Sequence, residues 1–369
     1  MVMPPAHMLP FEEADQYIEK FVAVGIDFGT TYTGVSWALS SQPKDIHSII
    51  GWPSKEYRNK DQVQVPTLYD ITSQKWGYEI TPDMNPMKWF KLLLLRKDDL
   101  AKEAGGNAKE VKQTLEILET IGRDISPVKL VGLYLGKVWD HTYTTLRSTI
   151  NIDSLPLRVG ITVPAIWPDY AKSSMKEAAK IAGITKHRAI GETSLVTVEE
   201  PEAAALASLF QRDAFIGIKK DESFIDVISY TVASEQPFKL RECIEGKGKL
   251  DGAFKIDQAF FSYLKGKAKL KIKSLKDSDY NDFILREWEL GAKRTFSSAD
   301  EPDFYNLHPP IEAYGKLDRI RGKEGLAISK LDMVGFFNKS LTGIRFLVGD
   351  QDKQVRSVTG KDPKVSLDS

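Results

Sequence analysis

The first residues that could carry chemistry form a glycine- and threonine-rich stretch at positions 27–34. Gly29 would let the backbone approach an anion closely, and Thr30 and Thr31 would add hydroxyl donors to the amides of a tight turn. Asp27 could hold a hydrated Mg²⁺ against the same phosphates. The stretch predicts a phosphate-binding turn, and an ordinary hairpin turn capped by an aspartate is the alternative.

Two later segments could contribute to the same chemistry. Residues 158–165 form an apolar strand that ends at a proline, and an alanine-rich helix follows as far as Gly183. Further on, Glu199 and Glu200 precede a run of small residues that starts at Pro201. A glutamate at this point is usually a capping group that complements the helix dipole, and the small residues favour close packing. By itself, each segment is also consistent with ordinary core structure.

The elements that must position these residues alternate along the chain. Strands are predicted over residues 21–26, 34–39, 65–69, 75–78, 157–163, 196–198, 224–232 and 238–243. Helices are predicted over residues 98–118, 128–148, 169–182, 201–209, 257–265, 284–294 and 330–348. Strands that alternate with helices favour an α/β fold over a helix bundle or a β-sandwich.

Composition narrows the function classes. A chain of 369 residues with 42% hydrophobic residues can form two or more packed units, and its 51 basic and 51 acidic side chains cancel. We therefore expect neither nucleic acid nor an acidic membrane surface as a partner. The single cysteine, Cys243, excludes an internal disulfide framework. Residues 1–19 do not resemble a secretory signal, and the apolar cluster 89–95 is too short to span a bilayer, so we expect a cytoplasmic protein.

Taken in order, these segments resemble the nucleotide-binding domain of the heat shock 70 kDa protein family, within the actin-like ATPase superfamily. They resemble in particular the divergent branch related to heat shock 70 kDa protein 12. The matching stretches, in chain order, are residues 27–34, 161–183, 199–209 and 292–298. The resemblance runs from about Val22 to Val365. It implies a two-lobed α/β fold of the actin-like (ribonuclease H-like) ATPase type with lobe II incomplete.

The resemblance also implies a role for each matching residue. Asp27 would bind Mg²⁺ through water, Lys91 would lie near the γ-phosphate, and Glu200 would orient the water shell of the metal. The phosphate turn would be formed by Gly29, Thr30, Thr31 and Tyr32, and the adenosine would be held by Lys293, Arg294 and Ser297. The cofactor implied is ATP or ADP with Mg²⁺. Carboxylates, a lysine and amide donors are the groups that γ-phosphate hydrolysis needs.

Two of these assignments have plain alternatives. Lys91 lies in an apolar segment and could instead be a lysine that extends along a helix to reach solvent. The segment around Lys293 and Arg294 could be a solvated basic helix end.

The resemblance predicts a domain organisation as well. Residues 1–20 would be a flexible N-terminal segment. Residues 21–213 would form lobe I, with residues 51–150 as its peripheral subdomain. Residues 214–369 would form a partial lobe II, with about 250–329 as its peripheral subdomain.

Two parts of the family pattern have no counterpart in the sequence. A second phosphate turn, Asp-x-Gly-Gly-Gly-Thr, is expected before the strand that contains Asp226, but residues 219–225 lack its glycines. Residues 330–359 resemble the helix before the family's adenosine motif, and the sequence reaches Ser369 before that motif begins. We therefore expect hydrolysis of Mg-ATP to be very slow or absent, because losing one well-placed electrostatic contact costs on the order of 2.7–4 kcal/mol in a transition state.

Other interpretations remain open at this stage. The chain could be a non-catalytic interaction scaffold, the truncated product of an alternative splice form or of a mis-predicted gene model, or a small-molecule kinase of the same superfamily. We expect the nucleotide as a ligand and a protein partner or client, with no nucleic-acid and no membrane partner.

Overall fold

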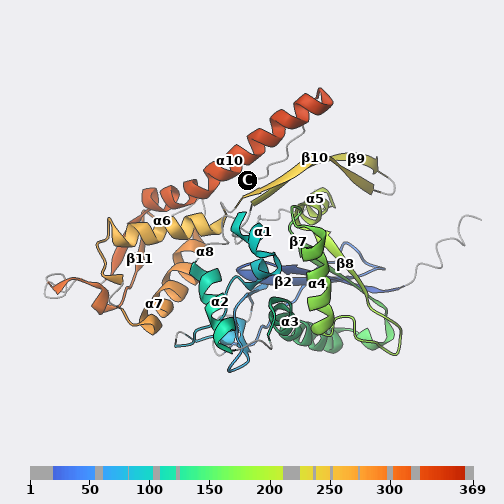
Figure 1. Cartoon of the computed structure of the whole chain (residues 1–369), viewed down its shortest axis with the longest axis horizontal. Helices are drawn as coiled ribbons and strands as arrows, with labels where there is room; N and C mark the ends of the chain where they lie inside the picture. Colours follow the sequence, from blue (N-terminus) through green and yellow to red (C-terminus); the bar gives the residue numbers. More distant parts are fainter. Residues whose placement is uncertain are drawn as a thin grey trace, which may run out of the picture.

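The computed structural model describes residues 20–54, 61–81, 83–102, 109–121, 125–210, 225–235, 238–249, 252–272, 275–296, 302–316 and 325–361. A mixed sheet with strand order β3-β2-β1-β7-β8 lies at the centre of the first half, and β4 also pairs with β2 (Figure 1). The strands are β1 (Val22–Phe28), β2 (Tyr32–Leu39), β3 (His47–Ser48), β4 (Gln64–Pro66), β7 (Leu157–Val163) and β8 (Ser194–Glu199). A separate small pair consists of β5 (Tyr69–Asp70) and β6 (Lys75–Trp76).

The hairpin of β1 and β2 carries the predicted phosphate turn. The two strands are antiparallel, and Asp27 pairs with Gly34 while Phe28 pairs with Thr33. Alternate residues of β1, such as Val24 and Ile26, are buried, as the period of a strand requires. β1 also pairs with β7 in parallel. This combination confirms the predicted hairpin and fixes which end of β7 lies beside the turn.

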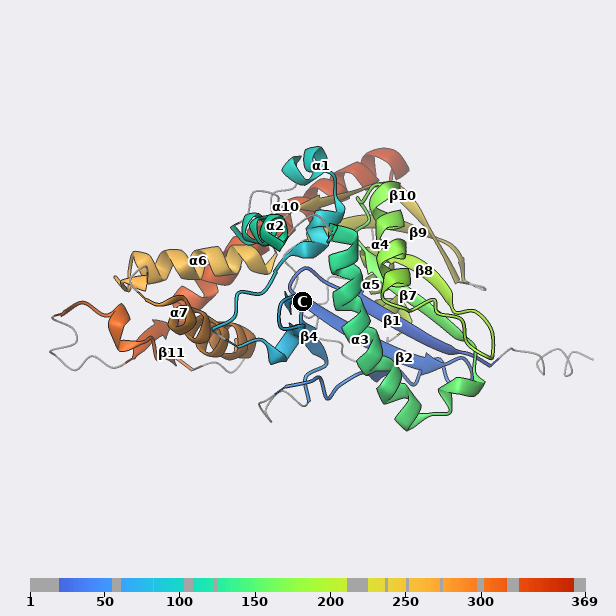
Figure 2. The same ribbon diagram turned by 60° about the horizontal axis from the view of Figure 1, so that its bottom comes forward.

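Helices α3 (Pro127–Thr149) and α4 (Asp169–Ile181) pack together beside this sheet (Figure 2). The side chain of Ser126 caps α3 by accepting a hydrogen bond from the Lys129 amide. Gly183 follows α4 with a φ of +79°, and its amide donates to the Lys180 carbonyl at 2.9 Å. The predicted glycine stop of this helix is therefore confirmed. The buried face of the sheet and these two helices share one hydrophobic core.

The remaining helices of the first half lie around this core. They are η3 (Gly77–Glu79), η4 (Phe90–Leu94), α1 (Lys97–Lys102), α2 (Lys109–Ile121), η5 (Ile152–Ser154) and α5 (Glu200–Phe210). The single helix predicted over residues 98–118 corresponds to α1 and α2, with residues 103–108 between them outside the described part.

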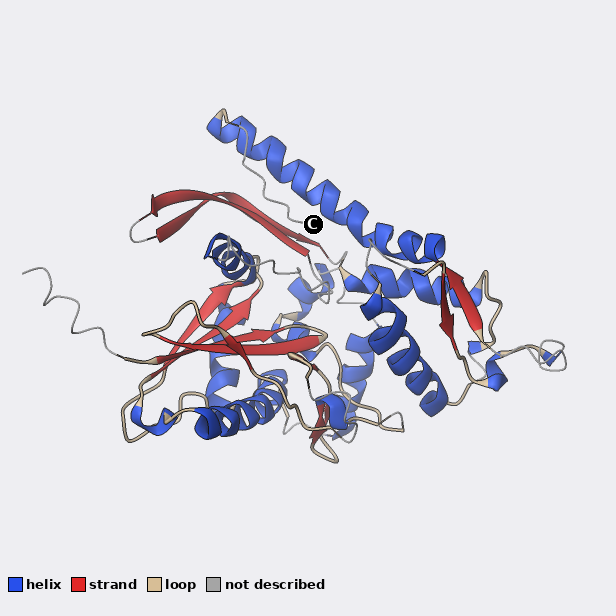
Figure 3. Cartoon of the chain, turned by 180° about the vertical axis from the view of Figure 1, so that it is seen from behind, coloured by secondary structure: helices blue, strands red, loops and turns tan. Residues whose placement is uncertain are grey.

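The second half is built around a long helix, α10 (Lys330–Thr359), which packs on α6 (Ala253–Lys265) (Figure 3). The other elements are β9 (Ile225–Glu235), β10 (Phe238–Lys249), α7 (Asp277–Phe283), η7 (Ile284–Ala292), α8 (Lys293–Thr295), β11 (Phe304–Leu307), η8 (Ile311–Ala313) and β12 (Leu326–Ser329). The rings of Phe260 and Trp288 stack at 3.8 Å in a second hydrophobic core.

The predicted fold class, mixed α/β, is confirmed. One core draws its buried residues from positions 22–184 and the other from positions 256–337. The lobe boundaries given above stay a prediction. Within the described residues, the helices are all too short or too polar to cross a bilayer.

Candidate functional site

The turn between β1 and β2 is closed by a backbone hydrogen bond. The amide of Gly29 donates to the Tyr32 carbonyl at 2.9 Å. A Cβ atom on Gly29 would lie 2.4 Å from that carbonyl oxygen. Because side chains do not tolerate such a contact with backbone, position 29 requires glycine. Thr30 is buried, Thr31 and Tyr32 are half-buried, and all three line a small pocket described below.

Buried hydroxyl groups stabilise the turn through hydrogen bonds. Thr67 donates its hydroxyl to the Gly29 carbonyl at 3.0 Å, and its amide donates to the Thr31 carbonyl at 2.7 Å. The Thr67 hydroxyl also lies 2.9 Å from that of Thr33, which accepts from the Tyr134 phenol at 3.1 Å. Burial raises the pKa of Tyr134 far above its ordinary value. Sequence reasoning did not find Thr67, because a lone threonine after a short strand has no distinguishing pattern.

Asp27 occupies the end of β1, directly before the turn. Its carboxylate is half-buried and accepts a hydrogen bond from the Thr162 hydroxyl at 2.8 Å. The parallel register pairs Ile26 with Ile161, so Thr162 reaches Asp27 from the neighbouring strand. A carboxylate held at the carboxyl end of a parallel strand pair is in the usual place for ligand contact in α/β sheets.

Lys91 and Glu200 form a buried ion pair. The Lys91 ammonium lies 2.6 Å from Glu200 Oε1, and the two side chains are 3% and 13% exposed. The ammonium also lies 5.8 Å from the centre of the Phe28 ring and 5.7 Å from that of Trp167. The alternative of a lysine that extends along a helix to solvent is therefore wrong. The structure brings the two residues with predicted catalytic roles into direct contact.

Lys293 also lies in an ionic cluster. Its ammonium lies 2.9 Å from Asp257 Oδ1 and 3.0 Å from Glu289 Oε2, and its side chain is 9% exposed. Burial lowers the pKa of Lys293, but the charges of Glu289 and Asp257 outweigh burial and raise it overall. The alternative of a solvated basic helix end is wrong for Lys293.

Asp257 of α6 is a residue that the sequence did not single out. Burial raises the pKa of its carboxyl to about 7, with the charge of Glu289 as the second cause. The indole of Trp288 donates to Asp257 Oδ1 at 2.8 Å. The carboxyl is therefore held by two partners, Trp288 and Lys293, in a poorly solvated position.

Arg294 makes a different contact from its neighbour. Its guanidinium lies 5.7 Å from the centre of the Tyr32 ring, so it links α8 with the phosphate turn. Ser297, the third predicted adenosine residue, lies outside the described residues.

A pocket of about 190 Å³, which we call the turn pocket, lies between the phosphate turn and the helices of the second half. Thr30, Thr31 and Tyr32 of the turn line it, together with Asp257, Glu289 and Lys293 of the second half. The structure thus places two predicted groups, the turn and the Lys293 segment, on the walls of one cavity. Asp27, Lys91, Glu200 and Arg294 do not line this pocket.

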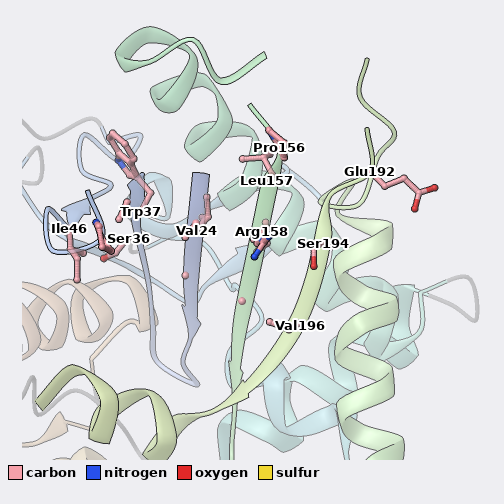
Figure 4. Close-up of a pocket in the computed structure, with 16 residues that line it drawn as sticks. Val24, Ser36, Trp37, Ile46, Pro156, Leu157, Arg158, Glu192, Ser194 and Val196 are labelled. Atoms are coloured by element: carbon pink, nitrogen blue, oxygen red, sulfur yellow. The ribbon is translucent and has the colours of Figure 1, made fainter. Parts of the chain in front are cut away.

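A second and larger cavity, of about 850 Å³, lies on the central sheet (Figure 4). Ala23, Gly25, Arg158 and Gly160 line it. They alternate with the buried residues of β1 and β7, which places the cavity on the face away from α3 and α4. None of the predicted site residues lines this cavity.

Asp27 is the acidic residue whose chemistry fits the implied metal. Within the described part of the chain, no cluster of three or more His, Cys, Asp or Glu side chains could enclose a metal ion. Mg²⁺ usually keeps several waters and takes its other ligands from one or two carboxylates and from phosphate oxygens. A single carboxylate beside a phosphate turn fits that mode of binding.

Comparison with known proteins gives relatives at low identity. No family model matches the chain. Heat shock 70 kDa protein 12A of Mus musculus is 26% identical over 55% of this chain and 31% of its own length. Heat shock 70 kDa protein 12B of Homo sapiens is 30% identical over 53% of this chain and 29% of its own length. The chaperone protein HscA homolog of Acinetobacter baumannii (strain AYE) is 22% identical over 94% of this chain and 55% of its own length.

The matched regions therefore span about a third of the two heat shock proteins and about half of the HscA homolog. The resemblance predicted from the motifs is confirmed by these relatives. Together with the mixed α/β fold, the homologues support a divergent actin-like ATPase domain of the heat shock 70 kDa family.

Proposed function

We propose that this chain binds ATP or ADP together with Mg²⁺ between the β1–β2 turn and the helix that carries Lys293. The observation that supports it best is the turn pocket, because the two predicted halves of the site line the same cavity. The relatives are heat shock and chaperone proteins, which agrees with a nucleotide-dependent domain.

Each group of residues at this site would have its own role in binding the nucleotide. The amides and hydroxyls of Thr30 and Thr31 would bind phosphate oxygens, since successive N–H groups in a tight turn form an anion site. Asp27, aligned by Thr162, would hold water molecules of the metal shell. When bound, Mg²⁺ would neutralise charge on the phosphate oxygens. Arg294, already against the Tyr32 ring, would close the site from the second half.

We further propose that hydrolysis is impaired. Glu200 neutralises the Lys91 ammonium at 2.6 Å, so the positive charge expected near the γ-phosphate is already paired. Between α5 and β9 the sequence has one glycine, Gly217, and no Asp-x-Gly-Gly-Gly-Thr segment. Phosphate contacts from that side would be fewer, and electrostatic stabilisation of the transition state would fall.

The family resemblance also leads us to propose a two-lobed arrangement with lobes at residues 21–213 and 214–369. Nucleotide would then favour a closed state of the lobes, and a protein client or partner would respond to it. The partner proposal rests on the names of the chaperone relatives alone.

The proposal is tested by calorimetry of Mg-ADP and Mg-ATP binding, together with a phosphate-release assay. We expect Mg-dependent binding that weakens in Asp27→Asn, with little or no turnover. Asp140→Asn, which changes an exposed aspartate of α3, is the control and should bind like the wild type. No binding of either nucleotide would reject the proposal and favour a non-catalytic scaffold. Fast turnover that Asp27→Asn abolishes would reject the impaired hydrolysis.

A further inference from the structure

Lys88, which has no assigned role, faces the turn pocket. It lines the cavity together with Thr30, Thr31 and Tyr32 from the phosphate turn. Lys91, to which the family resemblance gave the phosphate role, does not line that cavity and is paired with Glu200 instead. The two lysines are three positions apart in the chain, but their side chains lie in different environments.

The side chain of Lys88 carries a partly buried charge. Among the described residues it makes no ion pair and no side-chain hydrogen bond. Burial lowers the pKa of Lys88, the charges of Glu110 and Glu289 raise it, Lys109 lowers it, and burial prevails. A buried charge without a partner is costly, and an anion placed beside it would recover part of that cost.

The backbone of Lys88 is fixed on both sides. Its amide donates to the Thr114 hydroxyl of α2 at 2.9 Å, and that hydroxyl donates to the Lys88 carbonyl at 2.7 Å. Thr114 itself is buried. These two hydrogen bonds fix the backbone of Lys88, so its side chain starts from a defined position on the pocket wall.

Trp89, the next residue, has a strained backbone. Its φ is +57°, in the left-handed region that bulky side chains rarely adopt, and its side chain is buried in the first core and lines the turn pocket. Backbone strain of this kind is concentrated at binding and active sites. Trp89 lies in the chain between Lys88, which lines the turn pocket, and Lys91, which is paired with Glu200.

We propose that Lys88 is a phosphate-binding residue, and that its ammonium and the Thr30–Thr31 turn both contact the phosphate chain of the nucleotide in the turn pocket. This inference rests on the proposed function, since it assigns a further contact for the same ligand. Asp257 and Glu289 line the same pocket, and both are paired with Lys293. Their carboxylates would repel phosphate, so the phosphates would lie beside the Lys88 ammonium and the turn.

The test measures binding of pyrophosphate, Mg-ADP and adenosine to the full chain and to three variants. Lys88→Met should weaken pyrophosphate and Mg-ADP by roughly tenfold to a hundredfold, the range expected for one hydrogen bond to a charged group, and leave adenosine unchanged. Lys88→Arg should retain most of the affinity, because it keeps the charge. Lys112→Met, which removes an exposed lysine of α2 that is not among the charges acting on Lys88, should match the wild type. Urea unfolding of each variant checks that the fold is intact.

Each outcome decides between the claims. Equal affinity of Lys88→Met and wild type for pyrophosphate, or an equal loss for adenosine, overturns the role of Lys88. Wild-type protein that binds pyrophosphate through Lys88 but not Mg-ADP keeps the anion site and overturns the proposed nucleotide function. Wild-type protein that binds none of the three overturns both.

Discussion

The Lys91 ammonium lies 2.6 Å from Glu200 Oε1, although the two residues are 109 positions apart in the chain. Lys91 belongs to η4, and Glu200 is the first residue of α5. The pair joins two segments with separately predicted catalytic roles. It also means that neither charge is available to a ligand unless the other is left unpaired.

Removing one member of this pair should destabilise the fold. We expect Lys91→Met to lower the free energy of unfolding by about 3–5 kcal/mol, because it leaves the Glu200 carboxylate buried without a partner. The double variant Lys91→Met/Glu200→Gln should lose less than this single variant. Urea unfolding measures both. The neighbouring pair Lys172–Glu199, at 2.8 Å but 23% and 30% exposed, is the control, and Lys172→Met should cost under about 1 kcal/mol. Equal costs at the two pairs would contradict the prediction.

The phosphate turn should not tolerate a side chain at Gly29. In Gly29→Ala the new Cβ would lie 2.4 Å from the Tyr32 carbonyl oxygen, so the turn must open. We expect a loss of stability of about 1–3 kcal/mol and weaker pyrophosphate binding. Gly34→Ala in the same hairpin is the control, since its Cβ would meet the Gln64 side chain at 3.4 Å, an ordinary contact. Wild-type pyrophosphate binding by Gly29→Ala would count against the turn as an anion site.

The hydroxyl of Thr67 should matter more than that of an equally buried threonine. Thr67→Val removes the hydroxyl that donates to the Gly29 carbonyl and that is hydrogen-bonded to the Thr33 hydroxyl. The Gly29 carbonyl and the Thr33 hydroxyl would each lose this hydrogen bond in a buried site. A loss of about 1–3 kcal/mol in the free energy of unfolding is expected. Thr142→Val on α3 is the matched control, because its hydroxyl only adds a bond to the Val138 carbonyl within the helix. Thermal and urea unfolding would detect the difference, and similar losses in the two variants would refute it.

Asp257 should make stability depend on pH. Burial raises its pKa from 3.8 to about 7 in the folded protein, so the folded state holds more protons than the unfolded state between these values. The contribution of Asp257 is therefore full below about pH 4 and is lost as pH rises through about 7, with a slope of up to about 1.4 kcal/mol per pH unit. Asp257→Asn should flatten the dependence of the free energy of unfolding between pH 5 and 8. Asp140→Asn should keep the wild-type slope, and a slope unchanged by Asp257→Asn would contradict the assignment.

Local pattern was sufficient for several elements. The predicted strand 157–163 coincides with β7, and the helix predicted at 169–182 differs from α4 by one residue at its end. Both have strong periodicity and clear stop signals, in particular Gly183. The helix predicted at 284–294 is instead a π-helix as far as Ala292. Gly291 there has non-helical backbone angles and approaches the Arg286 carbonyl so closely that a Cβ would lie 2.9 Å from it, a feature that residue periodicity does not reveal.

The sequence by itself determined the hairpin with its glycine turn, the alternation of strands and helices, and the family resemblance, because each depends on residues that are near one another in the chain. Only the tertiary structure decided that Lys91 is paired with Glu200, that Thr67 supports Gly29, and that Lys88 faces the turn pocket. These contacts join separate elements, and their geometry follows from how the sheet and helices pack. The glycine turn could be predicted from its residue types and spacing, but the ion pairs around it could not.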